Sequence, residues 1–314
     1  MNLKETFEKQ GGMKLLKQYY CGGALFTAIG EFLLLGKSKT SLEILRNAAS
    51  LKIKQKLEKK YLDKIEKIEK KYKEGSIATD RKVWICWFQG MENAPEVVKR
   101  CYASIKDNIT DREVILLTEN NYREYICFPQ EIQAKIDSGI IKGAHMSDLL
   151  RLELLQQYGG TWIDATVFCS SKNIPDYMLN SDLFLFQCLK PGRDGQSSII
   201  SNWFMTARPN QKFIFMMREL LYDYWKNNDE VIDYFIFHDF FQILIDRYPE
   251  EWNRVVPFSN SVPHILLLRL FDEYNDAIWN AVTAMTPFHK LTYKFKNSDT
   301  MKTNTNYQKI MEKL

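Results

Sequence analysis

The period of the hydrophobic positions changes along the chain and separates a helical region from an α/β region. Between Ser41 and Lys73 apolar residues recur every three or four positions without Gly or Pro, which predicts one long amphipathic helix, or two, with a lysine-rich outer face. From residue 82 onward, short apolar runs alternate with helical patterns. We expect a helical N-terminal region at 1–75 and an α/β domain at 76–314, with Gly75–Asp80 as the linker.

The α/β region begins with strand and helix signals in alternation. Lys82–Gly90 is an apolar strand that ends at glycine, and Pro95 begins a helix. Glu113–Leu117 is a second strand, and a helix follows around 132–136. This order predicts a largely parallel sheet with helices on both faces. No G-x-G-x-x-G follows the first strand and no P-loop motif occurs, which argues against a dinucleotide dehydrogenase or a P-loop enzyme.

The stretch from His145 to Val167 combines a helix, a glycine pair and a strand. Leucines at 149, 152 and 155 recur at helical spacing, and Ser147 or Asp148 suits the N-cap of this helix. Gly159-Gly160 supplies the backbone freedom that ends it. Thr161–Phe168 then has the β-branched and aromatic composition of a buried strand.

Asp164 is the one carboxylate in that strand pattern. In α/β proteins, ligands bind in the crevice beyond the carboxyl ends of the strands. Asp164 is therefore a candidate site residue on position alone.

Composition and charge narrow the class of protein. The chain has 314 residues, of which 45% are hydrophobic and 13% aromatic, enough for a sizeable core. The net charge is +4, but residues 1–74 hold 17 Lys and Arg against 9 Asp and Glu, so the rest of the chain is acidic. The six cysteines form no C-x-x-C pair, and we find no cleavable secretory signature, which together favour a reducing cytosol. The apolar run 21–35 is too short and too interrupted for a spanning helix.

The lysine-rich face of the 41–73 helix has two interpretations. It is either a solvated face on a helix that packs against the next domain, or a surface attracted to the anionic cytoplasmic leaflet of a membrane. Nucleic acid is a weaker third interpretation, because no recognisable binding motif accompanies the lysines.

Four motifs carry a resemblance to a known family over roughly residues 82–292. They resemble the sugar-nucleotide-dependent glycosyltransferases of the capsular polysaccharide synthesis type, which are similar to a yeast glycan-synthesis mannosyltransferase and the clostridial glucosylating toxins. In detail the chain resembles a bacterial capsule galactosyl- or glucosyltransferase. The motifs are Trp84-Ile-Cys-Trp87 with Gly90, Ser147-Asp148-x-x-Arg151, Tyr158-Gly-Gly-x-Trp-x-Asp164, and Ser201-Asn202-Trp-Phe-Met-Thr-Ala207-x-Pro209.

The resemblance implies a GT-A fold, an α/β fold with a Rossmann-like mixed sheet that binds a nucleotide-sugar. By matched position, Trp87 would stack on the uracil, Asp148 would hold ribose or sugar hydroxyls, and Arg151 would contact the donor sugar or phosphate. Ser147 and Trp162 belong to the same donor-binding set.

The same resemblance implies that a divalent metal, Mn²⁺ or Mg²⁺, is held by an Asp-x-Asp pair. Asp164 matches the first carboxylate, but Thr166 stands in the second position. One carboxylate and one neutral hydroxyl are a thin ligand set for such a cation. His289 is the best candidate for a further ligand, because related enzymes close over the diphosphate with a C-terminal segment. Lys290 or Lys294 could place positive charge on the leaving phosphate.

Two other regions are candidates for the acceptor and for closure of the site. Asp233 opens an aromatic-rich segment, 233–241, that we predict to be helical, and its polar edge could meet the acceptor sugar; we favour Asp233 slightly over Asp239 as a catalytic residue. Asn202 suits either a sugar contact or a structural role. The polar segment 190–198 suits a loop that orders over the substrate.

The chain shows no obvious acid–base pair and no arrangement for covalent catalysis, which fits a reaction whose leaving group is a nucleoside diphosphate. We expect a retaining transfer of galactose or glucose from a UDP-sugar to an undecaprenyl-diphosphate-linked saccharide. The expected location is cytoplasmic, peripheral on the inner face of the plasma membrane, and self-association stays open. Two alternatives remain: a non-catalytic sugar-binding or scaffold component of a capsule assembly complex, and a basic membrane-surface adaptor that works through 41–73.

Overall fold

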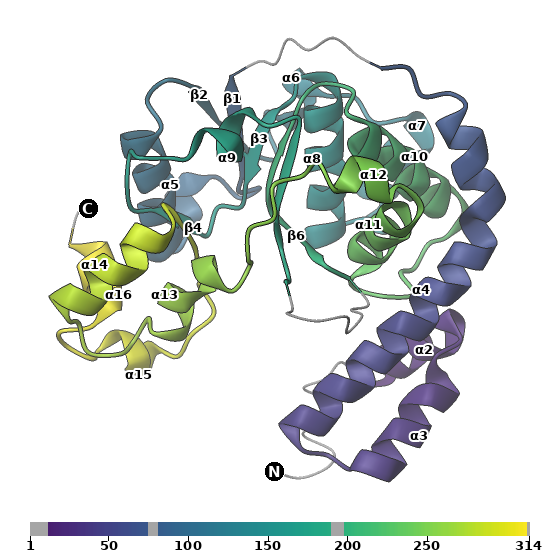
Figure 1. Ribbon diagram of the computed structural model, residues 1–314, viewed down its shortest axis with the longest axis horizontal. Helices are drawn as coiled ribbons and strands as arrows, with labels where there is room; N and C mark the ends of the chain where they lie inside the picture. The colour runs from purple at the N-terminus through teal and green to yellow at the C-terminus, as the bar shows by residue number, and fades with distance from the viewer. Residues whose placement is uncertain (1–11, 75–80, 190–197, 313–314) are drawn as a thin grey trace.

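A five-stranded mixed sheet lies at the centre of the computed structural model, which describes residues 12–74, 81–189 and 198–312 (Figure 1). β1 pairs in parallel with β2 and β3, whereas β6 pairs antiparallel with both β3 and β5, so the predicted mixed α/β sheet is confirmed, although it is less parallel than the alternation of strands and helices suggested. The strand order is β2 (Glu113–Leu117), β1 (Lys82–Cys86), β3 (Gly160–Ile163), β6 (Ile200–Ala207) and β5 (Leu183–Gln187).

Helices cover both faces of the sheet, and each face has its own hydrophobic core. Side chains alternate between the faces along each strand, so Trp84 and Trp162 enter one core while Ile85 and Ile163 enter the other. The first core holds α8 (Ala144–Gln157), α10 (Lys212–Asn227), α11 (Ile236–Arg247) and the N-terminal helices; the second holds α5 (Glu96–Asn108), α9 (Asp176–Asn180), α13 (Ile265–Leu268), α14 (Asp276–Met285) and α16 (Asn306–Met311).

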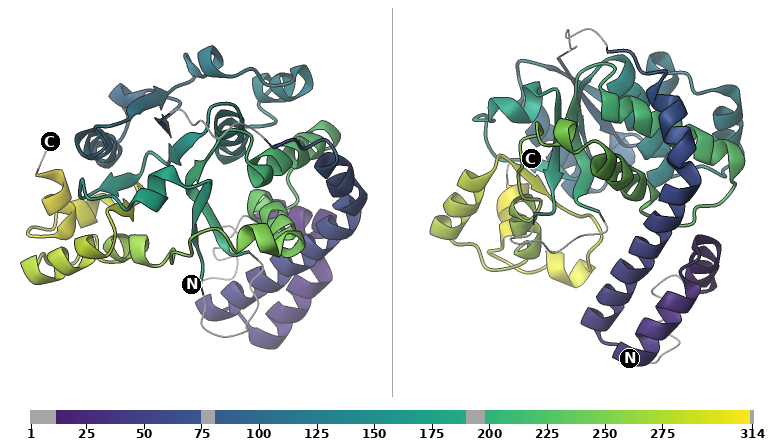
Figure 2. Two further views of the ribbon diagram at one scale, coloured as in Figure 1. Left: turned by 45° about the horizontal axis from the view of Figure 1, so that its top comes forward. Right: turned by 45° about the vertical axis from the view of Figure 1, so that its right-hand side comes forward.

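The N-terminal region is helical, as predicted, and consists of α2 (Gly12–Gly22), α3 (Leu25–Leu35) and α4 (Lys39–Glu69) in the described residues. The 41–73 pattern forms one helix of 31 residues, which Ser38 caps by accepting a hydrogen bond from the Ser41 amide. The apolar face of α4 packs on α10 and α11, within the same core as one face of the sheet. Helices α2 and α3 lie beside the first half of α4, away from the sheet (Figures 1 and 2).

Two predicted boundaries in the central stretch differ from the structure. Helix α8 begins at Ala144, with Gly143 as N-cap in a left-handed conformation (φ 56°), so neither Ser147 nor Asp148 caps it. The predicted strand 161–168 divides into β3 and β4 (Val167–Cys169). It divides because the Asp164 amide donates to the Trp203 carbonyl while the Val167 amide donates back to the Asp164 carbonyl, closing a turn. Strand β4 then pairs with β7 (Phe288–Lys290) in a separate two-stranded sheet.

The glycine pair ends α8 as predicted, and Gly159 is required there for two reasons. Its φ of +69° is unfavourable for other residues, and a Cβ would lie 2.7 Å from Pro209 Cδ and 2.9 Å from the Ala207 carbonyl oxygen. Its own carbonyl accepts a hydrogen bond from the Trp84 indole at 2.9 Å. This close approach fixes the start of β3, and with it the position of Asp164.

Short helices complete the chain, and the helices predicted after Pro95 and around 132–136 are confirmed as α5 and α7. The predicted linker 75–80 and most of the predicted loop, 190–197, lie outside the described residues. Within the described ranges, every helix is too short or too polar to cross a membrane. The remaining elements are η1 (Met91–Asn93), α6 (Tyr122–Tyr125), α7 (Gln130–Asp137), α12 (Pro249–Trp252), η2 (Val262–His264) and α15 (Asn297–Thr300).

Candidate active site

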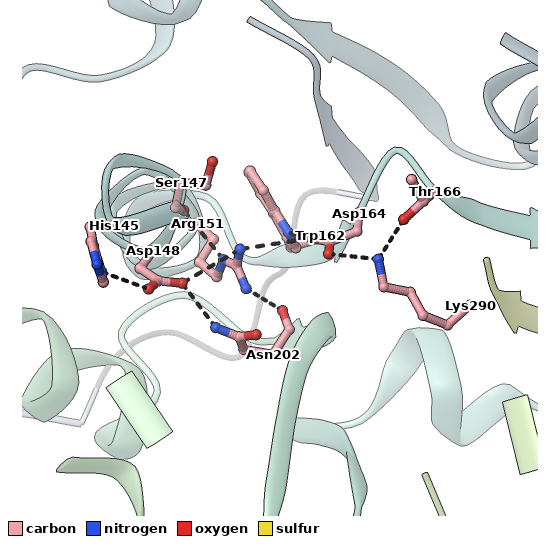
Figure 3. A network of polar contacts seen from close by, with 9 residues as sticks. All are labelled: His145, Ser147, Asp148, Arg151, Trp162, Asp164, Thr166, Asn202 and Lys290. Atoms are coloured by element: carbon pink, nitrogen blue, oxygen red, sulfur yellow. Dashed lines mark hydrogen bonds and ion pairs between the residues drawn. The ribbon is translucent and has the colours of Figure 1, made fainter. Parts of the chain in front are cut away.

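The central feature of the site is a chain of charged and polar side chains from four elements, drawn in Figure 3. Helix α8 supplies Asp148 and Arg151, the turn after β3 supplies Asp164, β6 supplies Asn202 and β7 supplies Lys290. Asp164 directly follows the carboxyl end of β3, where the sequence placed it. The predicted donor-side residues are therefore brought together although they are spread over more than 140 positions of the chain.

Arg151 lies between the two carboxylates. Its Nη2 is 3.6 Å from Asp148 Oδ1 and 3.7 Å from Asp164 Oδ1, and its guanidinium lies 4.9 Å from the centre of the Trp162 ring. Its Nη1 donates a hydrogen bond to the Asn202 backbone carbonyl, and its Nε donates to the Ser147 carbonyl. With a side chain only 5% exposed, Arg151 is fixed in place before any ligand arrives.

Asp148 is the more weakly compensated acid. Its Oδ1 accepts a hydrogen bond from Asn202 Nδ2 at 2.9 Å, and its Oδ2 lies 4.0 Å from His145 Nδ1. Burial raises the pKa of Asp148 to about 6, and Arg151 and Asn202 offset only part of that effect. Asn202 therefore positions Asp148 through its side chain and Arg151 through its backbone.

Asp164 is held by more positive charge. Its Oδ1 accepts from the Trp162 indole at 3.0 Å, and its Oδ2 lies 3.1 Å from Lys290 Nζ. Burial alone would raise the pKa of Asp164, but Lys290 and Arg151 outweigh it and the net pKa is lowered. Asp164 is thus a fixed negative charge, and Trp162 serves to orient it.

The predicted metal ligands do not assemble. His289 and Lys290 are neighbours on β7, so their side chains point to opposite faces. Lys290 reaches Asp164 and donates a hydrogen bond to Thr166 Oγ1, whereas His289 is fully buried beside Phe168 with Nε2 3.0 Å from Ser170 Oγ.

The pKa of His289 is lowered to about 4 by burial. Within the described residues no group of three or more His, Cys, Asp or Glu side chains could hold a metal ion. With one carboxylate, one hydroxyl and an ammonium group between them, these residues do not fit the Mn²⁺ or Mg²⁺ that the resemblance implies.

Trp87 lies just after β1, where its backbone amide donates to the Leu117 carbonyl. Its ring meets Tyr293 edge to face at a centroid distance of 5.4 Å. Its buried indole N–H has no hydrogen-bond partner among the described residues, which leaves a donor for a ligand. Ser147 contributes its backbone carbonyl to Arg151, while its hydroxyl points away from Asp148 (Figure 3).

Asp233 does not lie in the predicted helix. Helix α11 begins at Ile236, and the Asp233 carboxylate accepts a hydrogen bond from the Phe235 amide in the turn before it. The pKa of Asp233 is raised by burial. Asp239 is inside α11 but fully buried, with Oδ1 3.2 Å from Ser50 Oγ on α4. No polar contact joins either acid to the Arg151 cluster among the described residues.

Two residues near the site have no role in the sequence interpretation. Tyr234 lies 5.7 Å from the His145 ring, and its pKa is raised by burial and then by the charges of Asp148 and Asp164. Tyr293 contacts Trp87. The signal for both was their position, since each adjoins a segment singled out for other residues, Asp233 and His289.

A groove of about 1260 Å³ adjoins this part of the site. It runs between α2 and the ends of α8 and α10, and His145 and Tyr234 are among its lining residues. Apolar side chains from α2 and α3 line it together with Lys14 and Lys142.

This combination of an α/β sheet with acids and cations beyond its strand ends defines a ligand-binding α/β protein. Residues 36–310 match the sequence model of the family described as "Capsular polysaccharide synthesis protein". Because the match covers most of the chain, the protein belongs to the capsular polysaccharide synthesis protein family. The match begins at residue 36 and so includes α4, which lies outside the region 82–292 that carries the motifs.

Two curated relatives are similar to about half of the chain. The chain is 28% identical over 167 residues to "O-glycosyltransferase braB" of Annulohypoxylon truncatum, covering 48% of this chain and 38% of that protein. It is 25% identical over 169 residues to "O-glycosyltransferase PaGT" of Phomopsis amygdali, covering 47% of this chain and 39% of that protein. The chain thus spans about two fifths of the length of these relatives. Among solved structures, "PaToxG Glycosyltransferase" matches with a TM-score of 0.38 and 15% identity, covering 82% of this chain and 95% of that one.

Proposed function

We propose that this protein is a retaining glycosyltransferase of the GT-A type that moves galactose or glucose from a UDP-sugar to an undecaprenyl-diphosphate-linked saccharide during capsular polysaccharide repeat-unit synthesis. Family membership and the two O-glycosyltransferase relatives support the reaction class. The observation that carries the proposal is the placement of Arg151 and Lys290 on either side of Asp164, beyond the carboxyl end of β3.

The charges of the cluster suit a nucleotide-sugar. Arg151 and Lys290 supply two cations against two carboxylates, one of which has a pKa near 6. An incoming diphosphate adds negative charge that these two cations can bind, and a carboxylate beside them can accept hydroxyls of ribose or hexose. Trp87 and Tyr293 offer an aromatic pair to a base, and the buried Trp87 indole N–H is without a hydrogen-bond partner among the described residues.

The reaction needs positioning more than acid–base chemistry. The bond between the anomeric carbon and the β-phosphate oxygen breaks, and its electron pair stays on the phosphate. The acceptor oxygen bonds to the anomeric carbon from the same face, and the hydroxyl proton passes to the departing phosphate oxygen. Arg151 and Lys290 stabilise the developing phosphate charge in a site where they are already oriented.

The groove beside α2 supports the acceptor part of the proposal. It reaches Tyr234 and His145 at one end, next to Asp148, and apolar residues of the N-terminal helices line it elsewhere. A saccharide attached to a lipid diphosphate has both a polar and an apolar part. The polar end would enter at Tyr234, and Lys14 and Lys142 would meet the diphosphate.

Release of nucleotide from a panel of nucleotide-sugars tests the proposal. We expect UDP release from UDP-galactose or UDP-glucose, reduced at least about a hundredfold by Asp164→Asn because the fixed charge that orients Lys290 is lost. Asp107→Asn, an exposed acid on α5, is the matched control and should retain full activity. A protein that binds a UDP-sugar but leaves it intact in the presence of acceptor lipid would instead be the sugar-binding component considered above.

A further inference from the structure

Lys290 occupies the position between the two side chains that correspond to an Asp-x-Asp pair. Its Nζ is 3.1 Å from Asp164 Oδ2 and donates a hydrogen bond to Thr166 Oγ1. The backbone holds this arrangement, because β7 pairs Lys290 with Val167 and the Leu291 amide donates to the Thr166 carbonyl at 2.8 Å. The ammonium group is therefore part of a built site (Figure 3).

The acceptor groups around this ammonium are already in use. Asp164 Oδ1 accepts from Trp162 and lies near Arg151, and Oδ2 is paired with Lys290. Thr166 is buried and uncharged, and no third metal-binding side chain joins them within the described part of the chain. A divalent ion here would have to displace Lys290 and would gain a single protein carboxylate. One carboxylate does not compensate the loss of water from an ion with a tightly held hydration shell.

We propose that the Lys290 ammonium takes the place of the divalent cation and binds the donor diphosphate directly, so that donor binding and transfer need no metal. The inference rests on the proposed glycosyltransferase function and specifies the chemistry of the same site. Asp164 and Thr166 are then positioning residues for Lys290. An ammonium supplies one positive charge and three hydrogen-bond donors, and Arg151 adds a second charge within reach of the same carboxylate.

Calorimetric binding of UDP-galactose and UDP-glucose in EDTA and in MnCl₂ tests this inference. We expect the wild-type Kd to agree within about threefold in the two buffers, and Lys290→Met to weaken binding in EDTA at least about thirtyfold. Lys296→Met, an exposed lysine nearby, is the matched control. Electron paramagnetic resonance should show that added Mn²⁺ stays free in solution with the wild-type protein. Thermal melting identifies any variant that fails to fold.

A second variant tests the reverse change, from binding without a metal to binding that depends on one. The double substitution Thr166→Asp with Lys290→Ala restores two carboxylates and removes the ammonium, so it should bind donor in MnCl₂ and lose at least about tenfold in EDTA. Wild-type binding that requires MnCl₂ overturns the inference but leaves the proposed function standing. A double variant that binds as tightly as the wild type in EDTA overturns it as well. Failure to bind any nucleotide-sugar in either buffer overturns the proposed function itself.

A different observation concerns α3, whose outer face is apolar and exposed. Phe26 is 88% exposed, Leu33 77% and Leu34 82%, and Ile29 lies between them. Their spacing of three, seven and eight residues from Phe26 places them on one face of the helix. Ala28, on the opposite face, is buried, and α3 packs on α4 and α2. The exposed face therefore points away from the rest of the protein (Figures 1 and 2).

The charge around this face identifies what covers it. Residues 1–74 hold 17 Lys and Arg against 9 Asp and Glu, and Lys37 and Lys39 directly follow α3. The one acid of α3, Glu31, is not among the fully exposed outer positions. Eleven residues of helix span only about 16 Å, too short to cross a bilayer but long enough to lie in its interface. A second protein copy would bring the same excess of positive charge, whereas an anionic bilayer complements it.

We propose that the outer face of α3 inserts into the interface of an anionic lipid bilayer, with the lysines of the N-terminal region at the headgroups. The working surface is then α3 rather than the lysine-rich face of α4. This proposal is independent of the reaction and of Lys290, because it rests on the N-terminal helices alone. None of the exposed α3 residues Phe26, Leu33 and Leu34 lines the groove that reaches Tyr234.

Sedimentation with vesicles of phosphatidylcholine, with and without phosphatidylglycerol, tests the proposal on the full chain. We expect binding to the anionic vesicles, weakened at least about tenfold in the triple variant Phe26→Ser, Leu33→Ser, Leu34→Ser. Leu268→Ser, which changes an 80% exposed leucine at the far end of the molecule, is the matched control.

Three results would overturn the membrane proposal. The first is that the wild-type protein binds neither vesicle type. The second is that the triple variant binds anionic vesicles as tightly as the wild type. The third is that the wild-type protein binds no vesicles but forms a dimer in light scattering, and the triple variant is monomeric. UDP release by the triple variant, measured with a soluble acceptor or by donor hydrolysis, should equal that of the wild type. Loss of vesicle binding is thereby separated from loss of activity.

Discussion

Asp148 and Asp164 are two acids at one site that share Arg151 at almost equal distances, 3.6 and 3.7 Å. Asp148 has only Arg151 and Asn202 against the cost of burial, and its pKa rises to about 6. Asp164 has Lys290 and the Trp162 indole in addition, and its pKa falls although burial acts to raise it. Lys290, with a smaller contribution from the Trp162 hydrogen bond, separates a carboxylate that can change its charge near pH 6 from one that stays charged there. We infer different roles: Asp148 exchanges hydrogen bonds with a ligand, and Asp164 holds the cations in place.

Removing the Arg151 side chain should have the largest effect on stability and activity, because Asp148 and Asp164 then lose the positive charge that they share. Arg151→Met should lower the free energy of unfolding by about 3 kcal/mol and nucleotide release by at least about a thousandfold. Urea unfolding and UDP release measure the two losses. Arg151→Lys keeps the charge without the planar fork and should recover part of the stability but little of the activity. An Arg151→Met variant that retains wild-type activity would contradict the shared role.

The pH dependence distinguishes the two acids next. Because the folded-state pKa of Asp148, about 6, lies above its ordinary value of 3.8, the folded protein binds the extra proton between these values. Its contribution to the free energy of unfolding therefore falls as pH rises through this window, by about 3 kcal/mol in total. Asp164 has the opposite sign, and its stabilisation is lost only as pH falls toward and below 3.8.

Urea unfolding across this pH range measures the slope, and Asp148→Asn should remove it. The same variant should abolish the improvement in donor affinity that we expect in the wild type as pH rises through about 6. Asp107→Asn is the control, since that acid is exposed. An unchanged slope in Asp148→Asn would assign the titration to another group.

A smaller effect is expected from Asn202→Ala. The substitution removes the hydrogen bond to Asp148 Oδ1 but keeps the backbone carbonyl that Arg151 uses. We expect a loss of about 1 kcal/mol in stability and a rise of about tenfold in donor KM, with a further increase in the pKa of Asp148. Asn173→Ala, at an exposed asparagine, serves as the control. Equal kinetics in the two variants would show that Asn202 does not position Asp148.

The smallest effect should come from His289→Phe. The ring is buried on the face of β7 away from Lys290, and its contact with Ser170 contributes at most about 1 kcal/mol. UDP release should stay within about twofold of the wild type. Thr166→Val, which removes the hydroxyl that holds Lys290, should weaken donor binding more. If His289→Phe is the more damaging of the two, His289 is a ligand after all.

The sequence predicted the fold well where local signals were sufficient. The strand at 113–117, the helix after Pro95 and the glycine pair after α8 all match the structure, because turn chemistry and periodicity act over a few residues. The predicted 161–168 strand is wrong in its second half, since the break depends on the Trp203 carbonyl and on β7, both far along the chain. No local pattern carries that information.

The site shows the same division. The family resemblance implied that Asp148, Arg151 and Asp164 lie at one donor site, and the structure brings their side chains together. The resemblance suggested His289 as a further metal ligand and Lys290 or Lys294 as positive charge on the leaving phosphate, but strand parity decides which of the neighbours His289 and Lys290 faces Asp164. Asp233 was assigned to a helix whose start proved to lie three residues later. Tyr234 and Tyr293 could be recognised as site residues only from the structure, which places Tyr234 near Asp148 and Tyr293 against Trp87.

The central claim is that the donor binds across the Asp148–Arg151–Asp164–Lys290 cluster. Hydrogen–deuterium exchange with and without the UDP-sugar that is turned over tests this most directly. We expect slower exchange in peptides covering 145–151, 160–167 and 286–291, and no change in α3. Protection confined to α2 and the groove beside it, with these three segments unaffected, would show that the donor binds elsewhere.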